Sequence, residues 1–238
     1  MSNATWDALA ATPLPEVRRR AAVLDELAGV EPVTVPGALR SAWNDGGGQS
    51  AVWYFAEDGR ALLLTFDHES ELNLYAEDDY ALQESLYDGV PEALVALVRD
   101  RPENYESLNL TDPATGRTIH YAGGVFWYDG TRWQVSDGLV EYCRREDEDP
   151  FGESGFDYCL TGYLFGRDFT PETLVATRER TVSTRTSGRG KRTCSRCARS
   201  SPGTAGPGGE RLTGSRSGGR RRPRSPGIRY CVNRRRRR

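Results

Sequence analysis

Polar side chains gather directly after a predicted core strand, at Asp67, His68 and Glu69. A histidine flanked by carboxylates could act as a general base that a neighbouring acid orients. The alternative is a strand end that turns into solvent and uses these groups for local hydrogen bonds. No HExxH sequence, G-x-S-x-G nucleophile elbow or catalytic-cysteine signature accompanies the cluster. The strand-end interpretation is therefore favoured, and an enzyme with a site at this cluster is the alternative.

Cysteines near the carboxyl end have one feature of a metal site. Cys194 and Cys197 have the spacing of half a zinc site, but only Cys231 follows them and this region contains no histidine. A structural zinc site needs four ligands, so chance cysteines are the better interpretation. The sequence predicts neither a bound metal nor a cofactor.

A run of acids resembles the start of a calcium-binding loop. The match fails further on, because Phe151 occupies the third ligand position and Tyr158 stands where the closing glutamate belongs. A solvated loop, or a contact surface for a basic protein, explains the run better. The four candidate contact residues are Glu146, Asp147, Glu148 and Asp149.

Aromatic residues are concentrated in a predicted hairpin that contains Trp127 and Trp133. Alternate residues of a strand face opposite sides of its sheet, so most of these rings should belong to the core. A second interpretation is an exposed aromatic binding face that includes the two tryptophans.

The elements that would position these residues can be read from the hydrophobic periodicity. Residues 51–56 and 61–67 form a predicted hairpin around Asp58-Gly59, a pair that favours a tight turn. Both strands are apolar on both faces, so helices should cover the sheet on each side. Residues 106–136 read as an antiparallel meander. Helices are expected at residues 6–11, 15–28, 79–87, 91–99 and 156–165, and another should begin at Thr170-Pro171. In the helix at 15–28 the apolar stripe is Val17, Ala21, Leu24 and Ala28, and the arginines at 18–20 lie mostly outside it.

Together these elements predict an α+β fold for residues 1–176. This part carries 12 Arg against 32 Asp and Glu, a net charge of −20, and all of the Trp and Phe residues. Its length suits a single domain with one sizeable core. No apolar run is long enough to span a bilayer, the amino terminus lacks the features of a secretory signal, and the five cysteines are scattered. We therefore expect a cytoplasmic protein without membrane contact.

Residues 177–238 differ sharply in composition. They contain 20 Arg and Lys against two acids and are otherwise rich in Ser, Gly, Pro and Thr, which predicts a disordered basic tail. Three interpretations are open. The tail could bind nucleic acid through phosphate contacts, or it could screen the acidic domain. It could also be an out-of-frame translation of a GC-rich gene, since the helical pattern stops soon after Pro171.

The order of three segments resembles an uncharacterised family of small soluble proteins from actinobacteria. These segments are Phe66–Ser70, Asp88–Pro91 and the hairpin between Trp127 and Trp133, and the resemblance covers about residues 17–176. It implies a bacterial single-domain protein and carries no established activity. The acidic charge, the aromatic strands and the scarcity of catalytic groups favour a non-enzymatic binding module for a basic protein, similar to an immunity protein or an adaptor. Its oligomeric state does not follow from the sequence.

Overall fold

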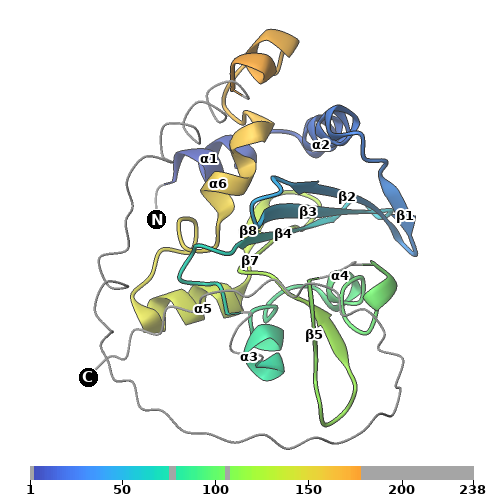
Figure 1. Ribbon diagram of the computed structural model, residues 1–238, viewed down its shortest axis with the longest axis vertical. Coiled ribbons are helices and arrows are strands. Elements are labelled where there is room, and N and C mark those ends of the chain that lie inside the picture. The colour runs from blue at the N-terminus through green and yellow to red at the C-terminus, as the bar shows by residue number, and fades with distance from the viewer. Residues whose placement is uncertain (1–2, 75–78, 105–107, 178–238) are drawn as a thin grey trace, which may run out of the picture. The chain divides into compact units, whose positions relative to one another are not determined.

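The hairpin predicted at residues 51–67 forms the centre of an antiparallel six-stranded sheet (Figure 1). The computed structural model describes residues 3–74, 79–104 and 108–177. The strand order is β1-β2-β3-β4-β7-β8, and β5 and β6 form a separate two-stranded sheet. The strands are β1 (Val33–Val35), β2 (Ala38–Asn44), β3 (Gln49–Ala56), β4 (Ala61–Asp67), β5 (Asn109–Thr111), β6 (Thr118–His120), β7 (Gly124–Tyr128) and β8 (Trp133–Val135).

Short helices surround the sheet, and α2 follows most of its predicted apolar stripe. Val17, Ala21 and Leu24 are buried, whereas Ala28 at the end of the stripe is exposed. Gly29 ends the helix with a left-handed φ of 68°. The helices are α1 (Ala4–Ala10), α2 (Leu14–Ala28), α3 (Tyr80–Ser85), α4 (Glu92–Val95), α5 (Asp137–Glu146) and α6 (Phe156–Leu160), with the 3-10 turns η2 (Pro102–Asn104) and η3 (Thr161–Tyr163) and a last helix at residues 171–177.

Two hydrophobic clusters lie on opposite faces of the large sheet. One contains Trp53, Leu63 and Phe126 and packs against α1, α2 and α6. The other contains Tyr54 and Leu62 and packs against α3, α4 and the small sheet. The strand register explains the division, because neighbouring residues of β3 and β4 alternate between the two faces. The α+β fold and the covering of both sheet faces, predicted from the apolar hairpin, are confirmed.

The predicted meander is divided between the two sheets. Residues 118–120 pair with β5, whereas β7 leaves them and pairs with β4. Gly124 makes this second pairing possible, because a side chain there would overlap the hydroxyl of Thr65 on β4. Period-two alternation identifies strands but not their neighbours, which is why the sequence suggested one continuous meander.

Three elements were not predicted: β1, β2 and α5. The segment 33–44 has proline and glycine at positions 36 and 37 and polar residues at 40 and 41, which interrupt its apolar residues, so its strand pattern is weak. Helix α5 has a clear beginning at Ser136, whose hydroxyl accepts a hydrogen bond from the Leu139 N–H at 3.4 Å, but it buries only Leu139 and Cys143. Because charged residues lie between and after these two, the sequence shows no clear helical spacing of apolar residues here.

The described residues all fall within one compact unit. Apart from Thr177, the predicted tail lies outside the described residues, together with its proposed disorder and the cysteines at 194, 197 and 231. Within the described ranges, no helix has both the length and the apolar composition needed to cross a bilayer.

Candidate functional site

Asp67, His68 and Glu69 lie where β4 ends, beside the loop that joins β2 to β3. The Asp67 carboxylate accepts hydrogen bonds from the Gln49 side-chain amide and from the Glu69 backbone N–H, each at 2.9 Å. His68 Nε2 lies 3.7 Å from Glu69 Oε1, and His68 Nδ1 lies 3.4 Å from Gln49 Nε2. Asp67 therefore positions Gln49 and the start of the turn, and within the described part of the chain no hydrogen bond joins its carboxylate to the imidazole.

The glycines at 46–48 have a structural role beside this histidine. Gly48 has a φ of 107°, and a side chain at this position would overlap the His68 ring. The backbone of His68 is also fixed, because its N–H donates to Gly48 O at 3.3 Å and its carbonyl accepts from Asn73 Nδ2 at 2.7 Å. The glycine run thus lets the β2–β3 loop pack closely against the end of β4.

Carboxylates from two distant segments of the chain meet around this strand end. The Glu71 N–H donates to Glu153 Oε2 at 3.1 Å, and Asp157 accepts two hydrogen bonds from Asn3 at 2.9 and 3.1 Å. Gly155 packs so closely on Asp67 that an added Cβ would lie 2.6 Å from the Asp67 Cβ. We call these five residues the acidic rim: Asp67, Glu69, Glu71, Glu153 and Asp157.

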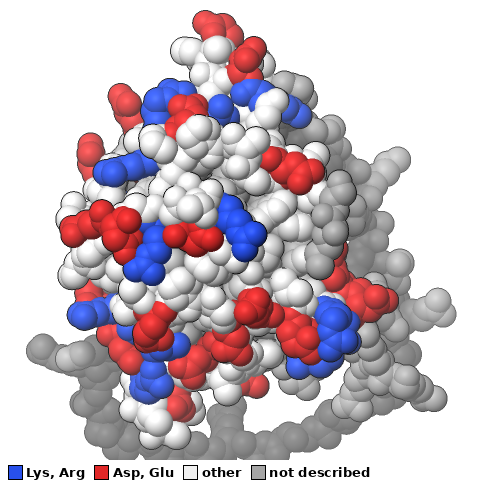
Figure 2. All heavy atoms as spheres, turned by 180° about the vertical axis from the view of Figure 1, so that it is seen from behind, with Lys and Arg blue, Asp and Glu red and all other residues white. Residues whose placement is uncertain are grey.

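No arginine among the described residues pairs with a member of the acidic rim. Elsewhere some acids are paired with arginine at close range, as Asp58 is with Arg60 and Glu141 with Arg144, and others are not. On the face shown in Figure 2, acidic and basic side chains are correspondingly interspersed. Among the described residues, the rim members other than Glu69 form no ion pair, and Glu69 pairs only with His68. The rim therefore concentrates negative charge without local compensation.

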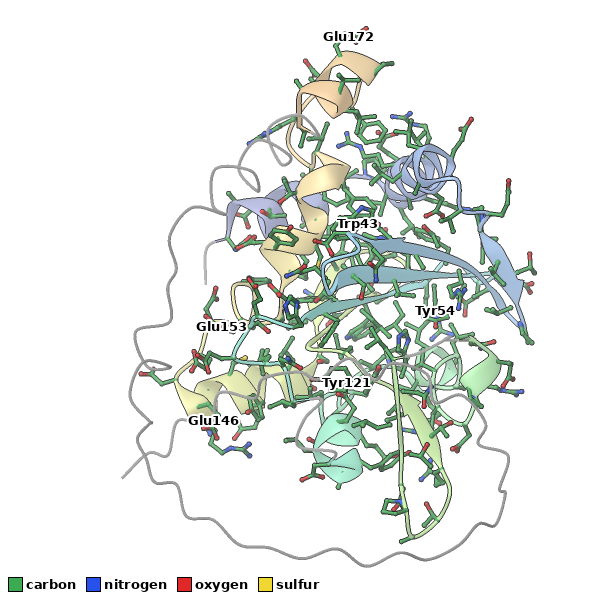
Figure 3. All side chains as sticks on the ribbon, in the orientation of Figure 1. Trp43, Tyr54, Tyr121, Glu146, Glu153 and Glu172 are labelled. Carbon is green, nitrogen blue, oxygen red and sulfur yellow. The ribbon has the colours of Figure 1, made fainter. Side chains whose placement is uncertain are left out.

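The predicted acidic contact loop adjoins this rim. Glu146 is the last residue of α5, and its Oε1 lies 3.2 Å from Arg145 Nε. Asp147 follows in the left-handed conformation, and the Glu148 N–H donates to Cys143 O at 2.9 Å. Asp149 accepts a hydrogen bond from the Gly152 N–H at 2.8 Å. Figure 3 shows Glu146 and Glu153 on the same side of the molecule. The local chain thus connects the predicted loop to the rim through Glu153.

The buried thiol of Cys143 lies near acids of both the predicted loop and the rim. Burial raises the pKa of Cys143 to about 12, and the negative charges of Asp149, Glu148 and Glu153 add to that increase. Burial also raises the pKa of Cys159 to about 12, and the negative charge of Asp67 makes a smaller contribution to that increase. Both cysteines are therefore protonated, unreactive core residues at neutral pH.

The two tryptophans of the predicted aromatic face are not brought together. Trp133 is buried in the cluster that contains Trp53, with their ring centroids 5.8 Å apart. Trp127 lies in β7 opposite Gln134 rather than opposite Trp133, and packs against the cluster on the other face. The aromatic hairpin therefore supplies core residues to both faces of the sheet.

One aromatic residue next to the rim was not predicted as functional. Tyr158 is 41% exposed, and its hydroxyl donates to Asp45 Oδ2 at 3.2 Å. In the sequence it was notable only because it replaces the closing glutamate of a calcium loop. Within the described ranges, no group of three or more His, Cys, Asp and Glu side chains is arranged to hold a metal ion.

The second histidine lies far from solvent. His120 is 3% exposed, its Nδ1 lies 3.4 Å from the Tyr54 hydroxyl, and that hydroxyl donates to Asn104 O at 3.0 Å. Arg40 donates to the same carbonyl at 2.6 Å. Figure 3 marks Tyr54, which points to the sheet face that α4 covers. His120 is thus part of a buried polar network between the sheet and η2.

This burial predicts a specific dependence of stability on pH. Burial, assisted by the Arg40 charge, lowers the pKa of His120 to about 3, whereas an unfolded histidine titrates near pH 6.5. As the pH falls below about 6.5, only the unfolded chain gains this proton, so the stability that is complete above pH 6.5 is progressively lost toward pH 3. Between pH 7 and pH 5 the loss due to His120 should be about 2 kcal/mol.

Urea unfolding of the wild type and of His120→Gln at both pH values would measure this contribution. The other titrating groups are common to both proteins, so the wild type should lose more stability than the variant on acidification. Equal losses in the two proteins would show that His120 does not remain neutral in the folded state.

No family model, curated protein or solved structure matches this chain.

Proposed function

We propose that this chain is a non-enzymatic binding module that recognises a basic protein through the acidic rim. The observation that supports it is the convergence of uncompensated carboxylates on one end of the sheet, in a domain whose residues 1–176 carry a net charge of −20. Complementary charge accelerates the encounter of two proteins and restricts the choice of partner. An immunity-type protein or an adaptor would use such a surface in this way.

The surroundings of the rim suit a protein partner. Tyr158 provides an exposed ring beside it, and tyrosines are enriched in protein interfaces because they combine a large apolar surface with a hydroxyl. The backbone of the rim is held by hydrogen bonds such as that from Glu71 to Glu153, so binding requires little ordering. The enzymatic alternative has less support, because Asp67 bonds Gln49 and the adjacent backbone.

A charge-neutralising variant would test the proposal. The double variant Glu71→Gln, Glu153→Gln removes two rim charges and keeps side chains that can still accept hydrogen bonds. Its affinity for a synthetic arginine-rich peptide at low salt should fall about tenfold relative to the wild type. Fluorescence anisotropy at several salt concentrations would measure the affinity, and wild-type binding should weaken steeply as salt is added.

Glu26→Gln, Glu31→Gln is the matched control. Both acids are exposed; Glu26 lies near the end of α2 and Glu31 lies in the segment after it. Replacing them changes the net charge of the chain by the same amount as the rim variant does. If the control variant loses as much affinity as the rim variant, binding reflects only overall charge and the rim is not the site.

A further inference from the structure

A cleft of about 480 Å³ lies at the opposite end of the central hairpin from the acidic rim. It is lined by residues from the start of α2, from β1 and β2 and from the end of β3. In Figure 1 helix α2 and strand β1 lie at the upper right. The rim adjoins Gln49 and Asp67, which are paired at one end of β3 and β4, whereas the cleft adjoins Ala56 and Gly59 at the other. The two sites are therefore separate, and a ligand could occupy the cleft whatever binds at the rim.

The floor of the cleft is apolar because of the strand register. Leu39 pairs with Phe55 on one side and with Thr34 on the other, so these three residues lie in a row across adjacent strands. Leu14 at the start of α2 covers the row. Leu39 and Leu14 are only partly buried, so an apolar ligand would remove further hydrocarbon surface from water.

Two charged side chains stand at the margin of this floor. Arg18 follows Leu14 by one helical turn and is exposed, and Glu57 belongs to the turn between β3 and β4. The next two arginines of α2 both bind Glu16, but Arg18 forms no ion pair with any acid among the described residues. The cleft thus combines a largely apolar floor with one guanidinium group that has no ion-pair partner among the described residues.

We propose that this cleft binds a small monocarboxylate with an apolar chain. A guanidinium group matches a carboxylate geometrically through two parallel hydrogen bonds. The volume of the cleft falls in the lower part of the range of small-molecule sites, about 300 to 1,000 Å³. Glu57 would repel a second carboxylate, which selects against dicarboxylates. The ligand class is therefore a medium-chain fatty acid or an arylalkanoic acid of similar size.

Titration of the full-length chain with octanoate would test this inference. Chemical shifts of the backbone amides should change in residues that line the cleft, including Thr34, Leu39 and Glu57, and not at the acidic rim. Affinity should rise about fourfold for each methylene added between butyrate and octanoate, since each buried CH₂ contributes about 0.8 kcal/mol. Octan-1-ol, which lacks the carboxylate, should bind about tenfold more weakly than octanoate.

Arg18→Gln isolates the charged contact. Because Arg18 is exposed, the variant should fold as the wild type does, and its affinity for octanoate should fall about tenfold while its affinity for octan-1-ol stays unchanged. Arg132→Gln, which removes an exposed arginine from the β7–β8 turn, is the control and should bind octanoate normally. Octanoate binding that Arg18→Gln leaves intact, or shift changes away from the cleft, would overturn the proposal.

Discussion

Replacement of Gly138 by alanine is expected to destabilise the fold by about 3 kcal/mol, because this glycine lies against backbone rather than against adaptable side chains. An added Cβ would overlap Ser85 O and would lie 2.9 Å from Ser85 C and 3.0 Å from Leu86 C. The same junction is held by hydrogen bonds from the Ser136 hydroxyl to Leu86 O at 2.7 Å and from the Gly138 N–H to Asp88 O at 3.2 Å. Helix α5 would have to separate from the end of α3.

Chemical denaturation of Gly138→Ala and Gly162→Ala would measure the effect. Alanine favours helix over glycine, so any stabilisation from helix propensity acts against the predicted loss at position 138. At Gly162 the nearest heavy atom to an added Cβ is Leu24 Cδ1 at 3.9 Å, an ordinary contact, and this variant should differ little from the wild type. A Gly138→Ala protein as stable as Gly162→Ala would mean that α5 does not pack tightly on α3.

Replacement of Arg20 by methionine is expected to cost about 3 kcal/mol, since it leaves buried carbonyl groups without a donor. Arg20 is 8% exposed and its Nη1 donates to Tyr163 O at 2.9 Å and to Leu164 O at 2.7 Å. Its guanidinium also lies 4.9 Å from the ring centroid of Phe169. This side chain therefore joins α2 to the segment that follows α6, and methionine retains only the apolar part of the contact.

Arg19 provides the matched control in the same helix. It binds Glu16 at 2.6 Å, as Arg20 does at 2.8 Å, but about half of its side chain is exposed and it donates to no distant carbonyl in the hydrogen bonds described. An exposed ion pair contributes little, so Arg19→Met should remain close to the wild type in thermal and urea unfolding. Equal losses in the two variants would assign the effect to Glu16 instead of the carbonyl contacts.

The arginines of α2 also show where reasoning from the sequence ends. The stripe of Val17, Ala21, Leu24 and Ala28 was sufficient to predict the helix and most of its buried side, although Ala28 is exposed. The same stripe placed the arginines at 18–20 mostly outside the core, and Arg20 is buried instead. Its burial depends on carbonyl groups more than 140 residues away, which local periodicity does not contain.

Strand pairing could likewise be predicted only where it depends on neighbouring residues in the sequence. The β3–β4 hairpin was predictable because its turn, Asp58-Gly59, is a local feature. The pairing of β7 with β4 instead of β6 depends on the close approach of Gly124 to Thr65, and a sequence pattern records no such contact. Helix α5 was missed for a different reason, because two buried side chains in ten residues are too few to establish a period.

The candidate site was predicted in pieces. Asp67, His68 and Glu69 were identified as polar residues at a strand end, and the acids from Glu146 to Asp149 as a separate loop. The hydrogen bond between Glu71 and Glu153 brings the two regions together across 82 positions of the chain. The shared feature of the rim, negative charge without an arginine partner, exists only in three dimensions. The cleft beside Arg18 likewise requires β1 and β2, which the sequence did not reveal.

The covering of both faces of the central sheet has a consequence for how this protein could diversify. Trp53 and Tyr54 are adjacent in the chain yet belong to different hydrophobic clusters, so substitutions in β3 disturb one cluster or the other. Most of both sheet faces is packed against other elements, and the main opening described above is the cleft over β1, β2 and the end of β3. Outside that cleft, recognition would fall to connecting loops and outer helix surfaces, where insertions and substitutions leave both clusters intact. Relatives with the same interior could differ completely in what they bind.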